Sequence, residues 1–193
     1  MSRKRVSLAG VGLFAASLLA AAPTRLLSHR VWLLDGVPDQ AAVAALREVG
    51  VDGFVVPVGQ VDVGEGSARF TLAPVPDLTP LAGVTVTGLV WVEGTGKATG
   101  DPAVFAAQFA PVARSLPHGG GVVLAARRFF PGLPGFARGV ASRLQSPVEL
   151  ALAAGDIRQH LPAEGWPGVR LVAFVFGNPT ALALPASTLQ DDA

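Results

Sequence analysis

VWLLDGVPDQAAVAALREVGVDGFVVPV, residues 31–58, decides the fold class of this chain. It opens with an apolar run, Val31–Gly36, that is typical of a buried strand. A helical stretch follows, with Asp39 placed to cap its first turn and Gly50 placed to end it. A second apolar run, Gly53–Val58, comes directly after the helix. A strand, a helix and a strand in this order predict two parallel strands joined by a right-handed crossover.

The same alternation of apolar runs and helical segments continues along the chain. Further strands are predicted at Val84–Val92, Gly121–Ala126, Val148–Ala153 and Val169–Phe176, with a short additional strand at Arg69–Leu72. Helices are predicted from Asp101, from Pro134 to Gln145 and from Asp156, and both aspartates are expected to be N-caps. This gives about six mainly parallel strands, whereas a closed eight-unit barrel takes about 250 residues. We therefore expect an α/β fold, namely an incomplete or open TIM-like (β/α) barrel.

An apolar segment near the amino terminus, Val6–Ala22, has no charged residue and follows three basic residues. This pattern predicts an export signal or a transmembrane helix. Small residues at its end would suit cleavage, but Pro23 would then follow the cut, where its fixed φ fits poorly. We expect residues 1–30 to form an uncleaved signal anchor with a short linker, and residues 31–193 to form one extracytoplasmic α/β domain. The alternative is a signal peptide that is removed.

The basic flank of this segment predicts its orientation, because positively charged flanks stay in the cytoplasm. We expect a single-pass protein of the cell inner membrane with its carboxyl-terminal domain in the periplasm. Cleavage of the leader would instead give a secreted or periplasmic protein. In an anchor, four small residues would form a face for packing against a partner's transmembrane helix: Ala9, Gly10, Ala16 and Ala20.

Composition argues against several kinds of site. The chain has no cysteine, which excludes disulfides, thiolate metal sites and cysteine nucleophiles. Residues 31–193 carry ten basic and fourteen acidic residues, a balance that argues against nucleic-acid binding. The glycine-rich segment Gly94–Asp101 lacks the spacing of a phosphate-binding loop, so no nucleotide is expected. The three histidines are widely separated, and we expect neither a metal nor a cofactor.

Polar residues at the predicted strand ends are the candidates for chemistry, because parallel α/β folds bind ligands at the carboxyl ends of their strands. Glu93 follows the third main strand and is the best candidate for a general acid or base. Asp35, after the first strand, is its proposed partner in a two-carboxylate hydrolase. Each carboxylate is also followed by glycine, as in an ordinary turn, so we favour a structural role for both.

Two arginines and two phenylalanines, Arg127-Arg128-Phe129-Phe130, follow the predicted strand Gly121–Ala126. The arginines could bind an anion, such as a lipid headgroup or a partner's carboxylates, although surface salt bridges would also account for them. Adjacent aromatic residues cannot both face inward from one strand, so one phenylalanine is expected at the surface. We regard these four residues as candidates for contact with a partner.

Four segments resemble the strand ends of an exported bacterial (β/α)-barrel family of uncharacterised function, whose shape is similar to that of glycoside hydrolases: VWLLDG, GGGVVLAARRF, PVELALAAGD and LVAFVFGNP. The resemblance runs over Val31–Asn178. It implies acidic residues at the end of the fourth strand, where this chain has Ala125-Ala126-Arg127. A cationic side chain cannot act as a glycosidase carboxylate, so the resemblance implies a barrel that has lost its chemistry.

These observations favour a role without catalysis. We expect a membrane-anchored extracytoplasmic accessory or structural subunit of a larger membrane protein assembly, because an open barrel has strand edges that must be covered. The alternative is an exported carbohydrate-active hydrolase that uses Glu93 and Asp35. A third hypothesis, a soluble ligand-binding module, would need a pocket that the sequence does not reveal.

Overall fold

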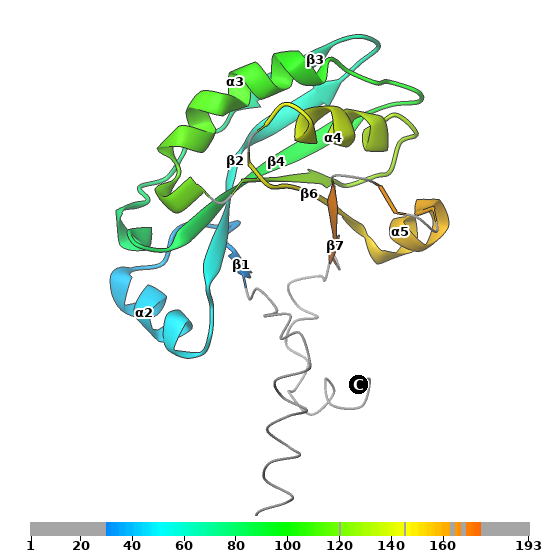
Figure 1. Ribbon diagram of the computed structural model, residues 1–193. Coiled ribbons are helices and arrows are strands. Elements are labelled where there is room, and N and C mark those ends of the chain that lie inside the picture. Colours follow the sequence, from blue (N-terminus) through cyan, green and yellow to red (C-terminus); the bar gives the residue numbers. More distant parts are fainter. Residues whose placement is uncertain (1–29, 120, 145, 163–164, 167–168, 175–193) are drawn as a thin grey trace, which may run out of the picture.

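The computed structural model describes residues 30–174, apart from residues 120, 145, 163–164 and 167–168. Within these residues one sheet forms, in the order β1 (Arg30–Trp32), β2 (Gly53–Val63), β4 (Thr85–Gly94), β5 (Val122–Ala126), β6 (Val148–Ala153) and β7 (Arg170–Phe174). Neighbours in this order are parallel, and β3 (Ala68–Leu72) pairs antiparallel with β2. The described chain is an open half-barrel of six parallel strands with helices, which confirms the predicted α/β class (Figure 1).

Helices connect most of the parallel strands: α2 (Gln40–Glu48), α3 (Pro102–Ser115), α4 (Leu133–Ala141) and α5 (Ala154–His160). Figure 1 shows α3 and α4 together over one face of the sheet. Asp39 and Asp101 cap α2 and α3 as predicted, each accepting a backbone N–H with its side chain. The cap predicted at Asp156 is wrong, because α5 begins after Ala153 and Asp156 lies within its first turn.

The connection from β3 to β4 has no α-helix, in keeping with its many prolines and glycines. It contains the 3₁₀ turn η1 (Thr79–Leu81), and a second 3₁₀ turn, η2 (Pro117–Gly119), precedes β5. The N–H and the hydroxyl of Thr79 donate to the carboxylate of Asp77, which lowers the pKa of that carboxyl group. Leu81 is fully buried, so η1 fastens this long connection to the core.

The outer face of the sheet, which the helices cover, holds the main apolar core. Phe105 and Phe109 of α3 stack on each other, and Phe136 of α4 packs against Phe105. Side chains alternate between faces along each strand, so that Val90 of β4 joins this core whereas Trp91 faces the opposite way. Burial of each such side chain contributes roughly 2 kcal/mol.

The inner face of the sheet carries a smaller apolar layer. Its members come from every parallel strand: Trp32, Val55, Leu89, Trp91, Val123, Ala125, Ala151 and Val172. In the register, Ala125 of β5 lies beside Trp91, and Ala151 of β6 lies beside Ala125, so large and small side chains lie next to each other within this layer. Charged residues lie on the inner face both before and after this layer along the strands.

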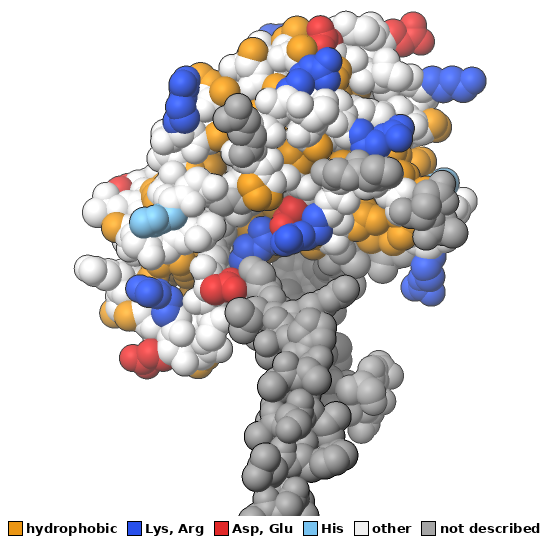
Figure 2. Space-filling model, in the orientation of Figure 1, with side chains coloured by type: hydrophobic (Ala, Val, Ile, Leu, Met, Phe, Trp, Pro, Cys, Tyr) orange, Lys and Arg blue, Asp and Glu red, His pale blue; other side chains and the backbone are white. Residues whose placement is uncertain are grey.

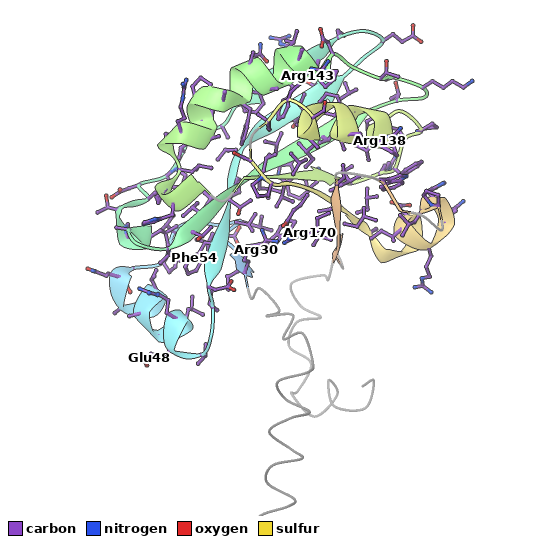
Figure 3. The ribbon with its side chains drawn as sticks, in the orientation of Figure 1. Arg30, Glu48, Phe54, Arg138, Arg143 and Arg170 are labelled. Carbon is purple, nitrogen blue, oxygen red and sulfur yellow. The ribbon has the colours of Figure 1, made fainter. Side chains whose placement is uncertain are left out.

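An ion cluster joins the first strand to the last two across the inner face. Nη2 of Arg30 in β1 donates to Oε2 of Glu149 in β6, and Nη1 of Arg170 in β7 lies 3.3 Å from Oε1 of the same carboxylate. The side chain of Glu149 is only 5% exposed. Strands β2, β4 and β5 separate β1 from β6 in the sheet, so these side chains meet because the sheet curls. Figure 3 shows Arg30 and Arg170 at the two edges of the half-barrel.

The path of the Arg30 side chain depends on a glycine. Gly53 of β2 is the register partner of Arg30. A Cβ at Gly53 would lie 3.2 Å from Cγ of Arg30 and 3.1 Å from the carbonyl oxygen of Thr85. The aliphatic part of the Arg30 side chain therefore passes directly over Gly53 of β2, where any side chain would obstruct it.

The predicted leader, Val6–Ala22, lies outside the described residues, as does its proposed helix-packing face. Within the part of the chain that the structure describes, no helix is long and apolar enough to cross a bilayer.

Replacing Glu149 with Ala is expected to lower the free energy of unfolding by roughly 3 kcal/mol, because the largely buried guanidinium of Arg30 loses its partner. Urea denaturation followed by circular dichroism measures the change. The control Glu48→Ala, on exposed α2 (Figure 3), should change it by less than about 0.5 kcal/mol. Combining Arg30→Met with Glu149→Leu removes both charges and should recover most of the loss. Equal effects of the two single variants would contradict the proposed role of Glu149.

Candidate functional site

Four charged side chains form a row across the inner face, near the carboxyl ends of the parallel strands. The register pairs Asp62 of β2 with Arg69 of β3 and with Glu93 of β4. Arg127 follows Ala126, the last residue of β5, and Ala126 pairs with the residue before Glu93. The rim row, as we call it, is therefore Arg69, Asp62, Glu93 and Arg127, with a cation at each end and two carboxylates between them.

Burial of the flanking residues explains why the two carboxylates face inward. Val61 and Val63, on either side of Asp62, are buried in the outer core, as is Val92 before Glu93. Alternation along the strands then turns Asp62 and Glu93 to the inner face, where both are exposed. Asp62 accepts a hydrogen bond of 2.9 Å from Nε2 of Gln60. No ion pair within 4.0 Å forms between rim-row residues, so their charges are available to solvent.

Arg127 is held by an aromatic ring instead of a carboxylate. Its Cζ lies 5.2 Å from the ring centroid of Trp91, which the alternation of β4 places on the inner face. A guanidinium over an aromatic face is attracted by the ring electrons while the donors along its edge stay free. Arg127 is therefore held in place and can still donate two parallel hydrogen bonds to an oxyanion.

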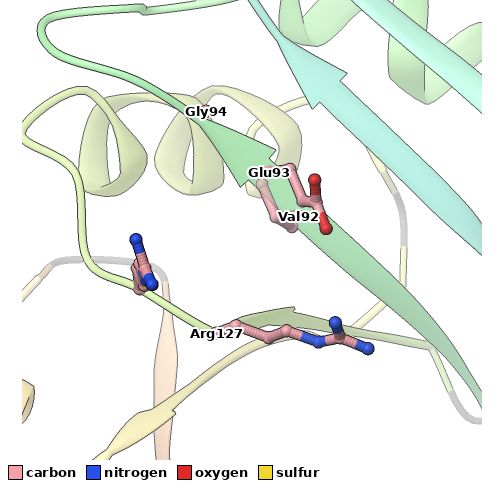
Figure 4. A pocket seen from close by; sticks show the side chains of 5 residues that line it. Val92, Glu93, Gly94 and Arg127 are labelled. Atoms are coloured by element: carbon pink, nitrogen blue, oxygen red, sulfur yellow. The ribbon is translucent and has the colours of Figure 1, made fainter.

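Two shallow pockets flank Glu93. The first, of about 340 Å³, is lined by Glu93, Arg127, Arg128 and two neighbours in β4, and Figure 4 shows it from close by. The second, of about 360 Å³, is lined by Asp62, Arg69, Glu93 and the turn between β2 and β3. Both volumes are near the lower end for small-molecule sites. Glu93 and Gly94 line both pockets, so the end of β4 lies between them.

Close packing holds the loop that carries Arg127 and Arg128 against the end of β4. The ring of Phe130 lies against Gly94, where a Cβ would come within 2.7 Å of it. At Gly132, a Cβ would overlap the carbonyl oxygen of Ala98. Both contacts are possible only because the residue is glycine. They brace the loop against the end of β4 and so fix the backbone of Arg127 and Arg128 relative to Glu93.

The expectation of a partner surface at Phe129 and Phe130 does not hold for Phe130, which is 3% exposed and lies in the outer core. Phe129 is partly buried and stacks on His160, with ring centroids 3.9 Å apart, while Trp166 lies 6.3 Å away. Both rings therefore pack against the outer core of the same chain, Phe130 within it and Phe129 at its margin beside Trp166. Arg127 and Arg128 are exposed, so the predicted partner contact now depends on the arginines.

Asp35 and Glu93 are not brought together by the sheet. In the register, Trp32 of β1 and Thr87 of β4 both pair with Val55 of β2, so the two residues lie at the same height in the sheet. Glu93 is six residues, or roughly 20 Å, further along β4. Asp35 is three residues beyond Trp32, a reach of about 10 Å at most. The carboxylate beside Glu93 is Asp62, and the alternation in Gln60-Val61-Asp62-Val63 is the signal that could have found it.

Neither the side chains of the described residues nor likeness to known proteins assigns a function to this chain. Within the described residues, no group of three or more His, Cys, Asp or Glu side chains could hold a metal ion. No protein-family model, characterised protein or solved structure matches this chain. The resemblance to an exported barrel family stays a prediction, and the function has to be argued from the geometry of the chain.

Replacing Gly132 with Ala is expected to lower the free energy of unfolding by about 2 kcal/mol, because the new methyl group meets the Ala98 carbonyl in a packed loop. The matched control is Gly135→Ala in α4, where a Cβ meets nothing within 4 Å. That variant should instead raise the free energy of unfolding by roughly 0.5 kcal/mol, because alanine favours helix. Urea titrations of both variants measure the difference, and equal stabilities would show that the loop is not braced at Gly132.

Proposed function

We propose that this chain is a non-catalytic, membrane-anchored accessory or structural subunit of a larger membrane protein assembly, with its half-barrel in the periplasm. The observation that carries the proposal is the open sheet. Within the described residues, β1 and β7 each pair with the sheet on one side only. Exposed strand edges are templates for pairing with another chain. A partner that adds strands at these edges would extend the half-barrel toward closure.

The inner face supports this proposal. Leu89 and Val123, on central strands, are fully buried, whereas Trp32 on β1 and Val172 on β7 are only partly buried. Trp91 on central β4 is also partly buried, but Trp32 and Val172 lie on the edge strands, where an added strand would bury them further. In Figure 2, apolar side chains reach the surface beside a group of basic and acidic side chains near the centre of the view, while other Lys and Arg side chains are spread over the visible face. The uncharged segment Val6–Ala22 is the sequence feature that supports attachment to the membrane.

The edge strands are expected to become protected from hydrogen exchange in the assembly. The full chain is extracted from its native membrane in mild detergent and compared with the isolated chain by amide hydrogen exchange and native mass spectrometry. Amides of β1 and β7 should exchange at least about tenfold more slowly in the extracted complex, because a partner strand accepts their hydrogen bonds. The central strand β5 is the internal control, since its exchange should not change. A complex with the mass of one 19.7 kDa chain, or unchanged exchange at both edges, would reject the proposal.

A second candidate function, carbohydrate hydrolysis, is favoured by one observation. Asp62 and Glu93 are register partners on adjacent strands, whose backbones lie about 4.8 Å apart. Retaining glycosidases hold two carboxyl groups about 5 Å apart. Glu93 also lines two pockets, as an acid placed between two sugar units would. Both carboxylates are exposed and lie on one wall of the sheet, and for this reason we place hydrolysis second.

Hydrolysis predicts a strict dependence on the two adjacent carboxylates. Release of reducing sugar from oligosaccharides should fall by about 100-fold or more in Glu93→Gln and in Asp62→Asn, because each variant removes a proton-transfer group. Asp35→Asn, a matched change at a carboxylate outside the rim row, should retain full activity. If the unmodified chain releases no sugar from any oligosaccharide tested, or if Glu93→Gln is fully active, this candidate fails.

A further inference from the structure

We propose that the rim row is a binding site for acidic oligosaccharides, whose sugar units carry both carboxylates and hydroxyl groups. The proposal concerns binding alone and rests neither on the accessory role nor on hydrolysis. It is carried by the order of charges in the row, by the fixed arginine at one end and by the pockets on both sides of Glu93.

The order of charges selects a ligand with separated anionic groups. Arg127 and Arg69 stand at opposite ends of the row, three strand spacings or about 14 Å apart along the backbone. Arg128 adds a second cation beside Arg127 in the first pocket. Each end can therefore hold one carboxylate, while a single small anion would occupy only one of them.

The centre of the row selects for hydroxyl groups. Ionised Asp62 and Glu93 are hydrogen-bond acceptors, so they bind groups that donate. A carboxylate placed between them would be repelled, whereas sugar hydroxyls can donate to both. A ligand with anionic ends and a hydroxylated centre meets both requirements, and a chain of sugar-acid units has that pattern.

The pockets set the size and direction of the ligand. Their volumes, about 340 and 360 Å³, suit one small unit each, on the two sides of Glu93. Because Glu93 belongs to both, a ligand that fills both runs across the strands and passes over this side chain. The exposure of all four rim-row residues allows an extended chain to lie in the site without being enclosed.

Arg127 supplies the geometric selectivity. Its guanidinium lies against Trp91, so the donors along its edge are held ready for a planar carboxylate. The packing of Phe130 on Gly94 fixes the backbone from which Arg127 and Arg128 project. A lysine at position 127 would retain the charge but lose the paired donors and the flat stacking surface.

Calorimetric titration of the full chain in detergent tests the proposal with three probes: the disaccharide of galacturonic acid, maltose and pyrophosphate. Digalacturonate should bind at least about tenfold more tightly than either of the others, because it alone has carboxylates and hydroxyls together. Arg127→Gln, Arg127→Lys and Arg69→Gln should each weaken digalacturonate by about tenfold. Glu93→Gln should weaken digalacturonate but not pyrophosphate, which carries no sugar hydroxyl groups for Glu93 to bind.

Arg114→Gln is the matched control, because Arg114 is an exposed arginine on α3 and its loss changes the net charge equally. It should leave digalacturonate binding unchanged, and circular dichroism verifies that every variant is folded. Three results would each overturn the proposal: no digalacturonate binding at millimolar concentration, pyrophosphate bound as tightly as digalacturonate, or equal losses in Arg114→Gln and Arg127→Gln. Hydrogen exchange at β1 and β7 tests the accessory role separately, so either proposal can fail alone.

Discussion

The buried carboxylate of Glu149 joins the first strand of the sheet to the last two, and its contacts constrain how the sheet curls. A carboxylate removed from water is costly unless cations and donors surround it. Here those cations come from β1 and β7, and the first of them lies four strand spacings away in the sheet. In a flat sheet this separation would be about 19 Å, further than the two side chains extend. Satisfying Glu149 therefore requires the curl of the sheet, which in turn encloses the inner apolar layer.

Charged residues of the same types have opposite roles at the two ends of the inner face. At the amino end of the strands, Glu149 and Arg30 are paired and largely buried, so their charges are not accessible to a ligand. At the rim, Glu93 and Arg127 are exposed, and Arg127 stacks on Trp91 without pairing with Glu93. A charge that already has a buried partner stabilises the structure, whereas one held by an aromatic ring can still bind a ligand. Ligand binding is therefore expected at the rim, whereas the proposed partner would pair at the open edges of the sheet.

Sequence reasoning predicted the fold well, because strands buried on both faces are continuous apolar runs that are hard to miss. It did not predict the features that depend on contacts between residues distant in sequence. The predicted second strand ends at Val58, yet the strand continues through an irregularity between Pro57 and Gly59 to Val63. A proline is tolerated at such a bulge, where a ladder hydrogen bond is already lost. The shortened prediction left Asp62 outside any strand, so its position beside Glu93 was missed. Glu149 was missed because its partners are remote in sequence.

The extension of β2 beyond Pro57 explains why the rim row exists at all. On one edge of β2, β1 stops at the level of Val55, and β3 takes its place from Gly59 onward. This exchange brings Arg69 into the sheet, while β4 runs alongside β2 as far as Gly94. The rim is therefore built on a part of the sheet that β1 does not reach, whereas the ion cluster that sets the curvature lies at the amino ends of the strands. Because the two regions use different residues, a substitution in the rim row removes none of the contacts that form the ion cluster.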